Sequence, residues 1–427
     1  MQSLADKLKA LGVQVGTQGL QAVKNSKSRG ANYRPIDEVL SGHVYETRLG
    51  STLMIQNTLE KSYKHGEVNL ASQFSFNALS RCSSEPAISE LSLESFAFID
   101  TETTGLMGGT GTYAFLIGVG RFISGEFQVT QILMRDPAEE PAQLVTLEEI
   151  LAPSEAIVTF NGKSFDIPLL KTRYKTHRWP FPLQKHPHID MLHLARRLWK
   201  DRLSSRALGN LEVNILGAVR TEEDIPGWAI PQLYFDYLMT GDASPLKRVV
   251  YHNSVDIVSL AALFSFTNDI LTDPLSDLIT HDLDIYAIGK LFEDAGEQDM
   301  AAQLFNLCLS RQKDGTGQQT KQLVTDVLMR LALIYKRNGN FSDALPLWEQ
   351  AADNEYLPAY VEIAKYYEHR QKENKTAQKW TNAAINLVTD LLSRNSISHY
   401  ESSHWLSELE HRQNRIRAKI LRSRILE

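Results

Sequence analysis

Hydrophobic and polar residues along the first two thirds of the chain follow two different periods in turn. Alternating or continuous apolar runs typical of strands occupy residues 96–99, 113–119, 127–133 and 156–160. Apolar residues at helical spacing occupy residues 142–151, 167–174, 191–199, 232–239 and 249–266. Strands that alternate with helices predict an α/β domain. Shorter patterned pieces between Ile36 and about Ala87, such as TLMIQNTLE, are predicted to be strands packed onto this domain.

The pattern changes near residue 275, after which strand signals disappear and a repeat emerges. Ala344 and Ala351 recur 33 residues later as Ala377 and Ala384, and residues 290–309 carry an earlier copy. Small residues at these offsets let two helices approach closely. The segment resembles tetratricopeptide (TPR) repeats, although a long amphipathic bundle can mimic one such match. The predicted organisation is therefore a basic flexible arm at 1–35, an α/β domain at 36–275 and an all-α TPR-like domain at 276–427.

Length and composition agree with two or three domains of a soluble protein. The chain has 427 residues, of which 43% are hydrophobic and 22% charged, as in ordinary globular proteins. The absence of a run of about 18 apolar residues predicts no membrane span, and the N-terminal sequence does not resemble a secretory signal. Two distant cysteines, Cys82 and Cys308, predict neither disulfides nor a zinc cluster and indicate a reducing cytoplasm.

The net charge of −6 argues against a surface that is basic throughout, but both ends of the chain are basic. Residues 1–35 and residues 411–427 each carry six lysines or arginines against one acid. Either end could contact phosphate, or could be an ordinary solvated charged face. Trp405, Leu409, Ile416 and Ile420 recur at helical spacing. We therefore expect the last segment to be a capping helix whose arginines point outward and are available to nucleic acid.

A pair of acids at the end of a hydrophobic strand is the first sign of chemistry. In FAFIDTETTGL, Asp100 and Glu102 stand two residues apart, so a strand directs both carboxylates to one face. Two such anions repel each other unless a cation lies between them, and Mg²⁺ and Mn²⁺ prefer oxygen ligands. The alternative is that both acids simply lie on the protein surface. The apolar residues FAFI that precede them argue against that interpretation.

Two later stretches add further acids. Asp166 follows the strand in VTFNGKSFDIPLL and begins a predicted helix, where a first-turn acid could also simply favour the helix dipole. His252 and Asp256 in VVYHNSVDIVSLAAL lie four residues apart, on one face of an apolar helix. A helix this apolar should be buried, and a buried acid must be paired or bind metal. An ordinary buried His–Asp pair remains possible there.

The three stretches together resemble a known family. FIDTETTG, NGKSFD and the pair His252–Asp256 are similar, in order and spacing, to the three motifs of DnaQ-like 3′–5′ exonucleases of the DEDD type, over residues 95–265. With its repeat-like tail, the chain is most similar to the YprB-like exonucleases of bacteria. The resemblance implies an RNase H-like fold and two divalent metals, Mg²⁺ or Mn²⁺. It also implies that these metals are held by the matching residues Asp100, Glu102, Asp166 and Asp256.

The third motif departs from the family pattern. Family members with a catalytic histidine usually carry the spacing H-x4-D, and members with a tyrosine carry Y-x3-D. This chain has His252-x3-Asp256 and Tyr251-x4-Asp256, so residue type and spacing are crossed. Geometry favours His252 as the general base because it shares a face with Asp256, and an imidazole ordinarily titrates near neutrality while a phenol titrates near about 10. Tyr251 stays open as the alternative. Asp190 is a fifth candidate acid, interpreted as a helix N-cap.

The resemblance implies a metal-dependent 3′–5′ exonuclease that hydrolyses DNA in bacterial DNA repair. A protein partner, such as a DNA helicase, is expected at the TPR-like domain. Two alternatives stay open at this point: an exonuclease that acts on RNA, and an inactive RNase H-like adaptor. Loss of a metal-site acid would favour the adaptor, and all four acids are present.

Overall fold

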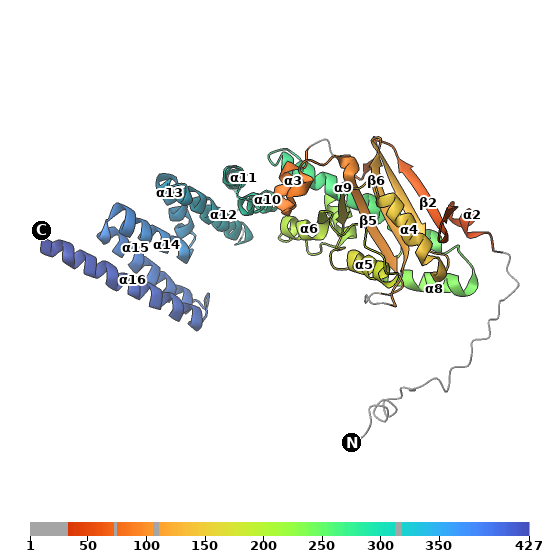
Figure 1. Cartoon of the computed structure of the whole chain (residues 1–427). Helices are drawn as coiled ribbons and strands as arrows, with labels where there is room; N and C mark the ends of the chain where they lie inside the picture. The colour runs from red at the N-terminus through yellow and green to blue at the C-terminus, as the bar shows by residue number, and fades with distance from the viewer. Residues whose placement is uncertain (1–32, 72–74, 106–110, 312–317, 427) are drawn as a thin grey trace, which may run out of the picture.

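The computed structural model of the chain describes residues 33–71, 75–105, 111–311 and 318–426. The predicted N-terminal arm therefore lies almost entirely outside the described residues. A sheet domain forms one end of the molecule, and a row of helices extends from it to the C-terminus (Figure 1). This arrangement confirms the predicted fold class, an RNase H-like α/β domain followed by an all-helical region.

A mixed sheet of seven strands, in the order β1-β2-β7-β6-β5-β8-β9, is the centre of the first domain. Its strands are β1 His43–Thr47, β2 Gly50–Leu59, β5 Phe96–Thr103, β6 Ala114–Ile123, β7 Glu126–Leu133, β8 Ala156–Thr159 and β9 His188–Asp190. Strands β3 (Lys64–His65) and β4 (Val68–Asn69) form a separate pair. The four strands predicted between residues 96 and 160 are confirmed as β5, β6, β7 and β8. The early strands β1 and β2 extend the same sheet, however, rather than pack onto it.

Helices cover both faces of this sheet. They are α2 Ile36–Leu40, α3 Asn77–Ser83, α4 Glu140–Leu151, α5 Asp166–Thr176, α6 Met191–Trp199, α7 Leu208–Leu211, α8 Ile230–Thr240 and α9 Leu246–Thr272, with short η1 Pro86–Ile88, η2 Leu93–Ser95, η3 Pro137–Glu139, η4 Glu212–Leu216 and η5 Gly227–Ala229. Because side chains alternate along β5, Phe96 and Phe98 pack with α3, α6 and α9 on one face. Ala97 and Ile99 pack with α4 and α5 on the other. This alternation also decides where Asp100 and Glu102 point.

Helix α9 crosses the sheet at close range. A Cβ atom on Gly118 of β6 would lie 2.3 Å from Asn253 Oδ1 of α9, and one on Gly120 would lie 2.6 Å from Ile257 Cγ2. Glycine at both positions is therefore required for this approach. Within the described residues, α9 alone is long and apolar enough to span a membrane, but 72% of its most apolar window is buried in the protein. It is the core helix of the domain.

Every element described beyond residue 275 is helical, as predicted. These elements are α10 Asp282–Asp294, α11 Gln298–Arg311, α12 Gln318–Arg337, α13 Phe341–Asp353, α14 Leu357–Tyr366, η6 Tyr367–Gln371, α15 Asn374–Ser393 and α16 His399–Leu426. Consecutive helices pack against each other. The four repeat alanines, Ala344, Ala351, Ala377 and Ala384, are fully buried, as close helix packing requires. The TPR assignment itself and the boundary at residue 275 stay predictions.

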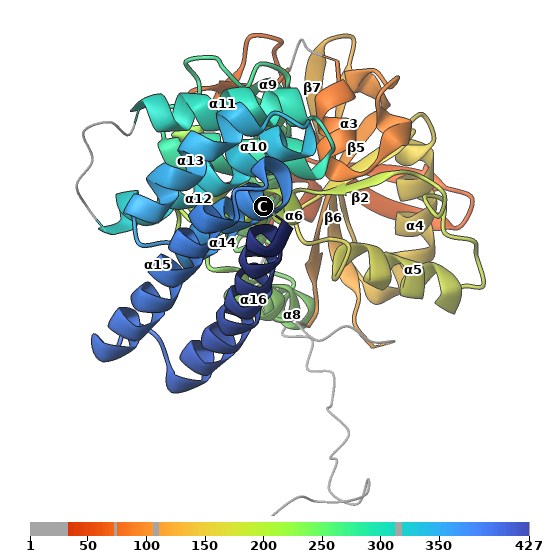
Figure 2. The same cartoon turned by 90° about the vertical axis from the view of Figure 1, so that its left-hand side faces the viewer.

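The hydrophobic core continues from the sheet domain into the first helices of this region. Trp199 of α6 and Phe264 of α9 belong to the same buried cluster as Phe292 of α10 and Leu331 of α12. Figure 2 shows the helical region on the side of the sheet domain that carries α6, away from α4 and α5. Helix α10 contacts α6 directly, so the two parts of the chain share one core.

The C-terminal helix α16 packs as predicted but directs some of its cations inward. Leu409 and Ile416 are buried, which fits a capping helix. Glu368 of η6, whose side chain is 0% exposed, accepts hydrogen bonds from Arg412, Arg415 and Lys419. The expectation that the arginines of this helix all point outward was therefore wrong, because a buried carboxylate between the helices needs their charge.

Candidate active site

The structure brings together the four acids that the motifs predicted. Asp100 and Glu102 follow Phe98 on the face of β5 that α9 covers, and Asp256 lies on α9. Asp166 is the first residue of α5 and is almost buried. Charges on Glu102, Asp166 and Asp256 all disfavour ionisation of Asp100, so four carboxyl groups meet at the end of one strand.

Protein donors reach three of these four carboxylates. Asn253 Nδ2 donates to Asp100 Oδ2 at 2.8 Å. The backbone N–H and the hydroxyl of Thr101 donate to Asp166 Oδ1 at 3.1 and 2.5 Å. The Arg220 guanidinium donates to Asp256 Oδ1. Neither Asn253 nor Thr101 was predicted, because their roles depend on which side chains meet across the sheet.

The acids remain costly to ionise despite these donors. Burial and repulsion by Asp256, Glu102 and Asp166 raise the pKa of Asp100 well above its ordinary value. Burial and the charges of Asp256 and Asp166 raise the pKa of Glu102 to about 8. Burial raises the pKa of Asp166 to about 6, against the hydrogen bonds from Thr101. An added cation would relieve this repulsion.

The donor set fits divalent metal ions of the hard kind. Four carboxylates with no thiolate nearby are ligands that Mg²⁺ and Mn²⁺ accept. Among the described residues, no three acidic, histidine or cysteine side chains are already grouped in metal-holding geometry. Instead, Asp256 faces Arg220 and Asp166 faces Thr101. Metal binding would therefore require these carboxylates to exchange protein donors for the ion.

Arg220 is the main residue at the site that the sequence did not predict. Its Nε lies 2.6 Å from Glu212 Oε2 and its Nη2 lies 2.5 Å from Glu212 Oε1, a two-point pair in which Glu212 is buried. Burial disfavours the charged guanidinium, but its bonds to Glu212 and Asp256 outweigh that cost and raise its pKa overall. Arg220 thus supplies a fixed positive charge beside Asp256. It lies between helices, where no periodic pattern marks it.

His252 and Tyr251 have different surroundings. His252 Nδ1 lies 2.6 Å from Asp224 Oδ1, and its Nε2 lies 3.6 Å from Asp256 Oδ2. The Tyr251 hydroxyl accepts hydrogen bonds from the backbone N–H and the hydroxyl of Thr221. The predicted geometry, with His252 and Asp256 on one face, is confirmed. The choice of His252 as the base stays a prediction.

Asp190 caps α6, as predicted, and also holds the loop of the second motif. Its Oδ1 accepts from Leu192 N at 3.1 Å, which is the N-cap bond. The same carboxylate accepts from Asn161 N at 2.7 Å and from Lys163 N at 3.1 Å. Asn161 has a φ of 65°, a left-handed conformation that such bonds help to maintain. Asp190 thereby fixes the turn that leads to Asp166.

Each of two cavities is lined by two of the four acids. One, of about 730 Å³, is lined by Glu102, Asp166 and Phe165 among others. The other, of about 460 Å³, is lined by Asp100, Asp256, Arg196 and Arg206 among others. The four acids are therefore divided between two cavities that a substrate could fill.

Comparison with known proteins agrees with this fold. Residues 97–268, which run from β5 through most of α9, match the family model of the RNase H superfamily. This part of the chain is therefore similar to RNase H superfamily domains. Similarity to this superfamily indicates a nuclease-like function.

A second comparison extends beyond the RNase H-like domain. The chain is 36% identical over 283 residues to YprB of Bacillus subtilis (strain 168), a protein described as uncharacterized. The match covers 65% of this chain and 65% of that relative. It supports the predicted resemblance at the level of sequence.

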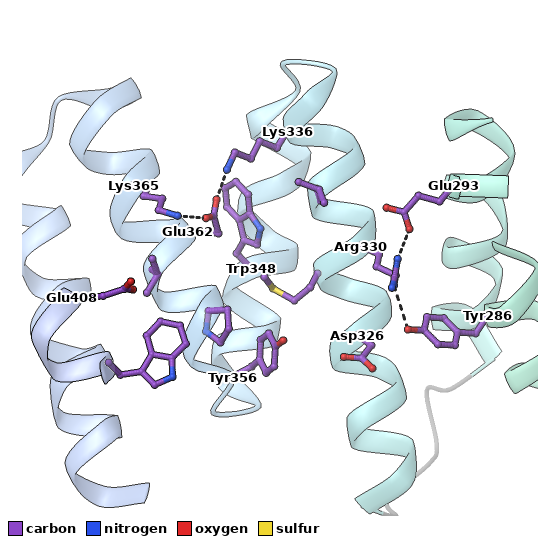
Figure 3. Close-up of a pocket in the computed structure, with 15 residues that line it drawn as sticks. Tyr286, Glu293, Asp326, Arg330, Lys336, Trp348, Tyr356, Glu362, Lys365 and Glu408 are labelled. Atoms are coloured by element: carbon purple, nitrogen blue, oxygen red, sulfur yellow. Dashed lines mark hydrogen bonds and ion pairs between the residues drawn. The ribbon is translucent and has the colours of Figure 1, made fainter. Parts of the chain in front are cut away.

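A separate cavity of about 570 Å³ lies in the helical region, between α10, α12, α14 and α16 (Figure 3). Its three cations are all paired. Arg330 binds Glu293 and Tyr286, while Lys336 and Lys365 both bind Glu362. Trp348, Tyr356 and Trp405 supply its aromatic lining. A surface whose cations are already neutralised is poorly suited to phosphate.

Proposed function

We propose that the protein is a two-metal-dependent 3′–5′ exonuclease of the DEDD type that hydrolyses phosphodiester bonds of DNA. The observation that carries this proposal is the meeting of Asp100, Glu102, Asp166 and Asp256 in one RNase H-like domain. Burial and mutual repulsion raise the pKa of these acids. A structural role would not call for four such carboxylates together, whereas the binding of Mg²⁺ or Mn²⁺ would.

The chemistry follows from the positions of these groups. All four acids would hold the metals, with Asp100 in the central position between the others. Two bound ions would stabilise the negative charge on the attacking and leaving oxygens of the phosphodiester. His252 would accept the proton of the attacking water at Nε2, because Asp224 holds Nδ1. The Arg220 charge beside Asp256 would help to keep that carboxylate ionised.

The biological setting proposed here follows the sequence resemblance. We expect the enzyme to act in DNA repair in the bacterial cytoplasm. The cavity of the helical region, with its paired cations and its aromatic lining, would take a protein partner such as a DNA helicase rather than nucleic acid. The helical region would then place the nuclease on its substrate without taking part in the chemistry.

Degradation of end-labelled nucleic acids tests the proposal. Single-stranded DNA, duplex DNA and RNA of one sequence are incubated with the full chain and Mn²⁺, and in parallel with EDTA. We expect stepwise shortening of DNA from its 3′ end, which EDTA abolishes. Asp100→Asn should be inactive, while Asp277→Asn, a change at an exposed aspartate remote from the site, should behave as the unmutated protein. Preference for RNA would support the exoribonuclease instead, and activity in EDTA would contradict the metal mechanism.

A further inference from the structure

The charged cluster around Glu368 of η6 holds more cations than its carboxylate balances. That carboxylate accepts hydrogen bonds, at 2.8 or 2.9 Å, from three cations of α16: Arg412, Arg415 and Lys419. One negative charge therefore faces three positive charges. The side chains of Arg415 and Lys419 are 38% and 37% exposed, so a ligand from the solvent can reach both. The buried acid accounts for one cation and leaves the other two unbalanced.

The charges around His369, the next residue of η6, are also mostly positive. Burial lowers the pKa of His369, and the charges of Lys419, Arg415 and Arg412 lower it further, against the carboxylate of Glu368 alone. Burial likewise lowers the pKa of Arg412, and the charge of Arg415 adds to this effect while Glu368 opposes it. Cations that disfavour each other's charge would be relieved by an added anion.

Arg370 extends the positive surface along η6. Its guanidinium lies 4.7 Å from the centre of the Phe341 ring, its side chain is exposed, and no carboxylate among the described residues pairs with it. A guanidinium that rests on an aromatic ring keeps its N–H donors for another partner.

Arg370 and His369 also line a cavity of about 190 Å³. This cavity adjoins the one in Figure 3, because the two share lining residues: Lys336, Trp348, Glu362 and Lys365. In the shared part, two lysines bind one glutamate. The charge at this end of the helical region is therefore positive on balance, unlike that of the remaining lining in Figure 3, where Glu293, Asp326 and Glu408 outnumber Arg330.

We propose that η6 and the C-terminal half of α16 form a binding surface for the phosphate backbone of a nucleic acid, contacted by Arg370, Arg415 and Lys419. Guanidinium and ammonium groups bind phosphate oxygens without reading sequence. The cations lie on two separate elements, and the repeated charges of a backbone can contact all of them. A nucleic acid is favoured over an acidic peptide because the sheet domain of the same chain is similar to RNase H superfamily domains.

This surface is separate from the site of the four acids. Helix α16 runs to the C-terminus, which lies at the end of the molecule opposite the sheet domain (Figure 1). A strand held there stays close to the chain without occupying the acidic site, which raises its effective concentration at that site. The inference goes beyond the proposed exonuclease function, because this binding requires neither metal nor cleavage.

Binding to the full chain in EDTA tests the proposal. Fluorescence anisotropy measures the Kd of a forty-nucleotide single strand of DNA, and of RNA of the same sequence, as NaCl rises from about 50 to about 200 mM. Arg370→Gln and Lys419→Gln should each raise Kd roughly threefold or more. Each should also reduce the slope of log Kd against log salt by about 0.7, as loss of one phosphate contact to a single strand does. Arg370→Lys should bind nearly as the unmutated chain.

The design separates these effects from loss of structure and from loss of charge alone. Lys419→Gln leaves Glu368 paired with two arginines, so the thermal midpoint should change little. Lys321→Gln is the matched control. Lys321 is an exposed lysine of α12, about 22 Å along that helix from Lys336, and it does not line the cavity. Its loss changes the net charge equally and should leave Kd and the slope unchanged.

Two further probes decide the class of ligand. Similar effects on DNA and RNA would support recognition of the shared backbone. Tighter binding of fluorescein-labelled polyglutamate than of either nucleic acid, weakened by Arg370→Gln, would overturn the proposal in favour of an acidic protein partner. Equal effects of Lys321→Gln and Arg370→Gln would also overturn it, as would unchanged binding in both Arg370→Gln and Lys419→Gln. Because no metal is present, the result is the same whether or not the four acids cleave DNA.

Discussion

His252 and Asp224 form a hydrogen-bonded pair, with 2.6 Å between Nδ1 and Oδ1. The two residues are 28 positions apart, and Asp224 lies in a turn that the sequence pattern did not mark. A carboxylate on one ring nitrogen fixes the orientation of an imidazole and leaves the other nitrogen available. In His252 that available atom is Nε2, which faces Asp256.

We expect His252→Ala to lower kcat by about 10²–10⁴-fold, the usual effect of losing a general base. Tyr251→Phe should lower it less than threefold or so, because Thr221 alone among the described residues bonds the phenol oxygen. Single-turnover hydrolysis of a labelled oligonucleotide with Mn²⁺ measures both. A larger effect of the tyrosine change would reverse the assignment.

Asp100→Ala should abolish activity and yet leave the fold intact. The substitution removes one of four carboxylates that repel each other, so the thermal midpoint without metal should stay the same or rise. Loss of a metal ligand should lower the rate by several orders of magnitude. Thermal unfolding and nuclease assays on one preparation test both halves, and a strongly lowered midpoint would contradict the first.

The buried ion pair between Arg173 and Glu140 should be important for stability. Both side chains are at most 5% exposed, and Nε lies 2.5 Å from Oε1. Arg173→Met should lower the free energy of unfolding by roughly 3 kcal/mol, because it leaves a buried carboxylate without that partner. Arg81→Met breaks an exposed pair with Glu297 and should cost under about 1 kcal/mol. Urea unfolding measures the difference, and equal losses would contradict the argument.

Glu368 should make the helical region sensitive to acid. Burial alone would raise its pKa, but hydrogen bonds from Arg415 and Lys419 outweigh burial and lower the pKa from 4.5 to about 2. A lowered pKa stabilises the folded state above the unfolded value of 4.5, and this contribution is lost as the pH falls toward 2.

Unfolding followed by circular dichroism across this pH window measures the effect. Glu368→Gln should be less stable at neutral pH and should lose less stability on acidification than the unmutated chain. Glu408→Gln, at an exposed glutamate of α16, is the control and should retain the normal dependence. An unchanged pH dependence in Glu368→Gln would show that this cluster does not couple α16 to η6.

A chain that ends at residue 275 should hydrolyse small substrates but unfold more easily. It keeps all four acids, yet it loses Ile288 and Phe292, which pack in the same core as Trp199. We expect hydrolysis of thymidine 5′-(p-nitrophenyl phosphate), a small phosphodiester, to persist at low temperature and the thermal midpoint to fall. A truncated protein that folds and binds Mn²⁺ but has no activity would show that the helical region takes part in the chemistry.

The sequence predicted those parts of the site that follow from the two-residue repeat of a strand or the turn of a helix. Asp100 and Glu102 share a face because strands alternate, and His252 and Asp256 share one because four residues make about one helical turn. The fold class followed from the same periods. Strand β9 was missed because three residues are too few to show alternation.

The rest of the site depends on contacts between distant segments, which no local pattern carries. Arg220 reaches Asp256 over 36 positions, and Asn253 reaches Asp100 over 153. Asp190 illustrates both cases. Its N-cap role is local and was predicted, whereas its bonds to the loop at Asn161 span 29 positions and were not.

Helix α6 contacts both the acidic site of the sheet domain and the first helix of the helical region. One side of it presents Arg196 to the cavity that Asp100 and Asp256 also line. Its C-terminal end packs Trp199 into the core shared with α10 and pairs Arg197 with Asp294 of that helix. A displacement of α10 would therefore be transmitted through α6 to Arg196. Arg196 lies on α6 itself, whereas the four acids lie on β5, α5 and α9, so such a displacement would move the arginine more directly than the acids.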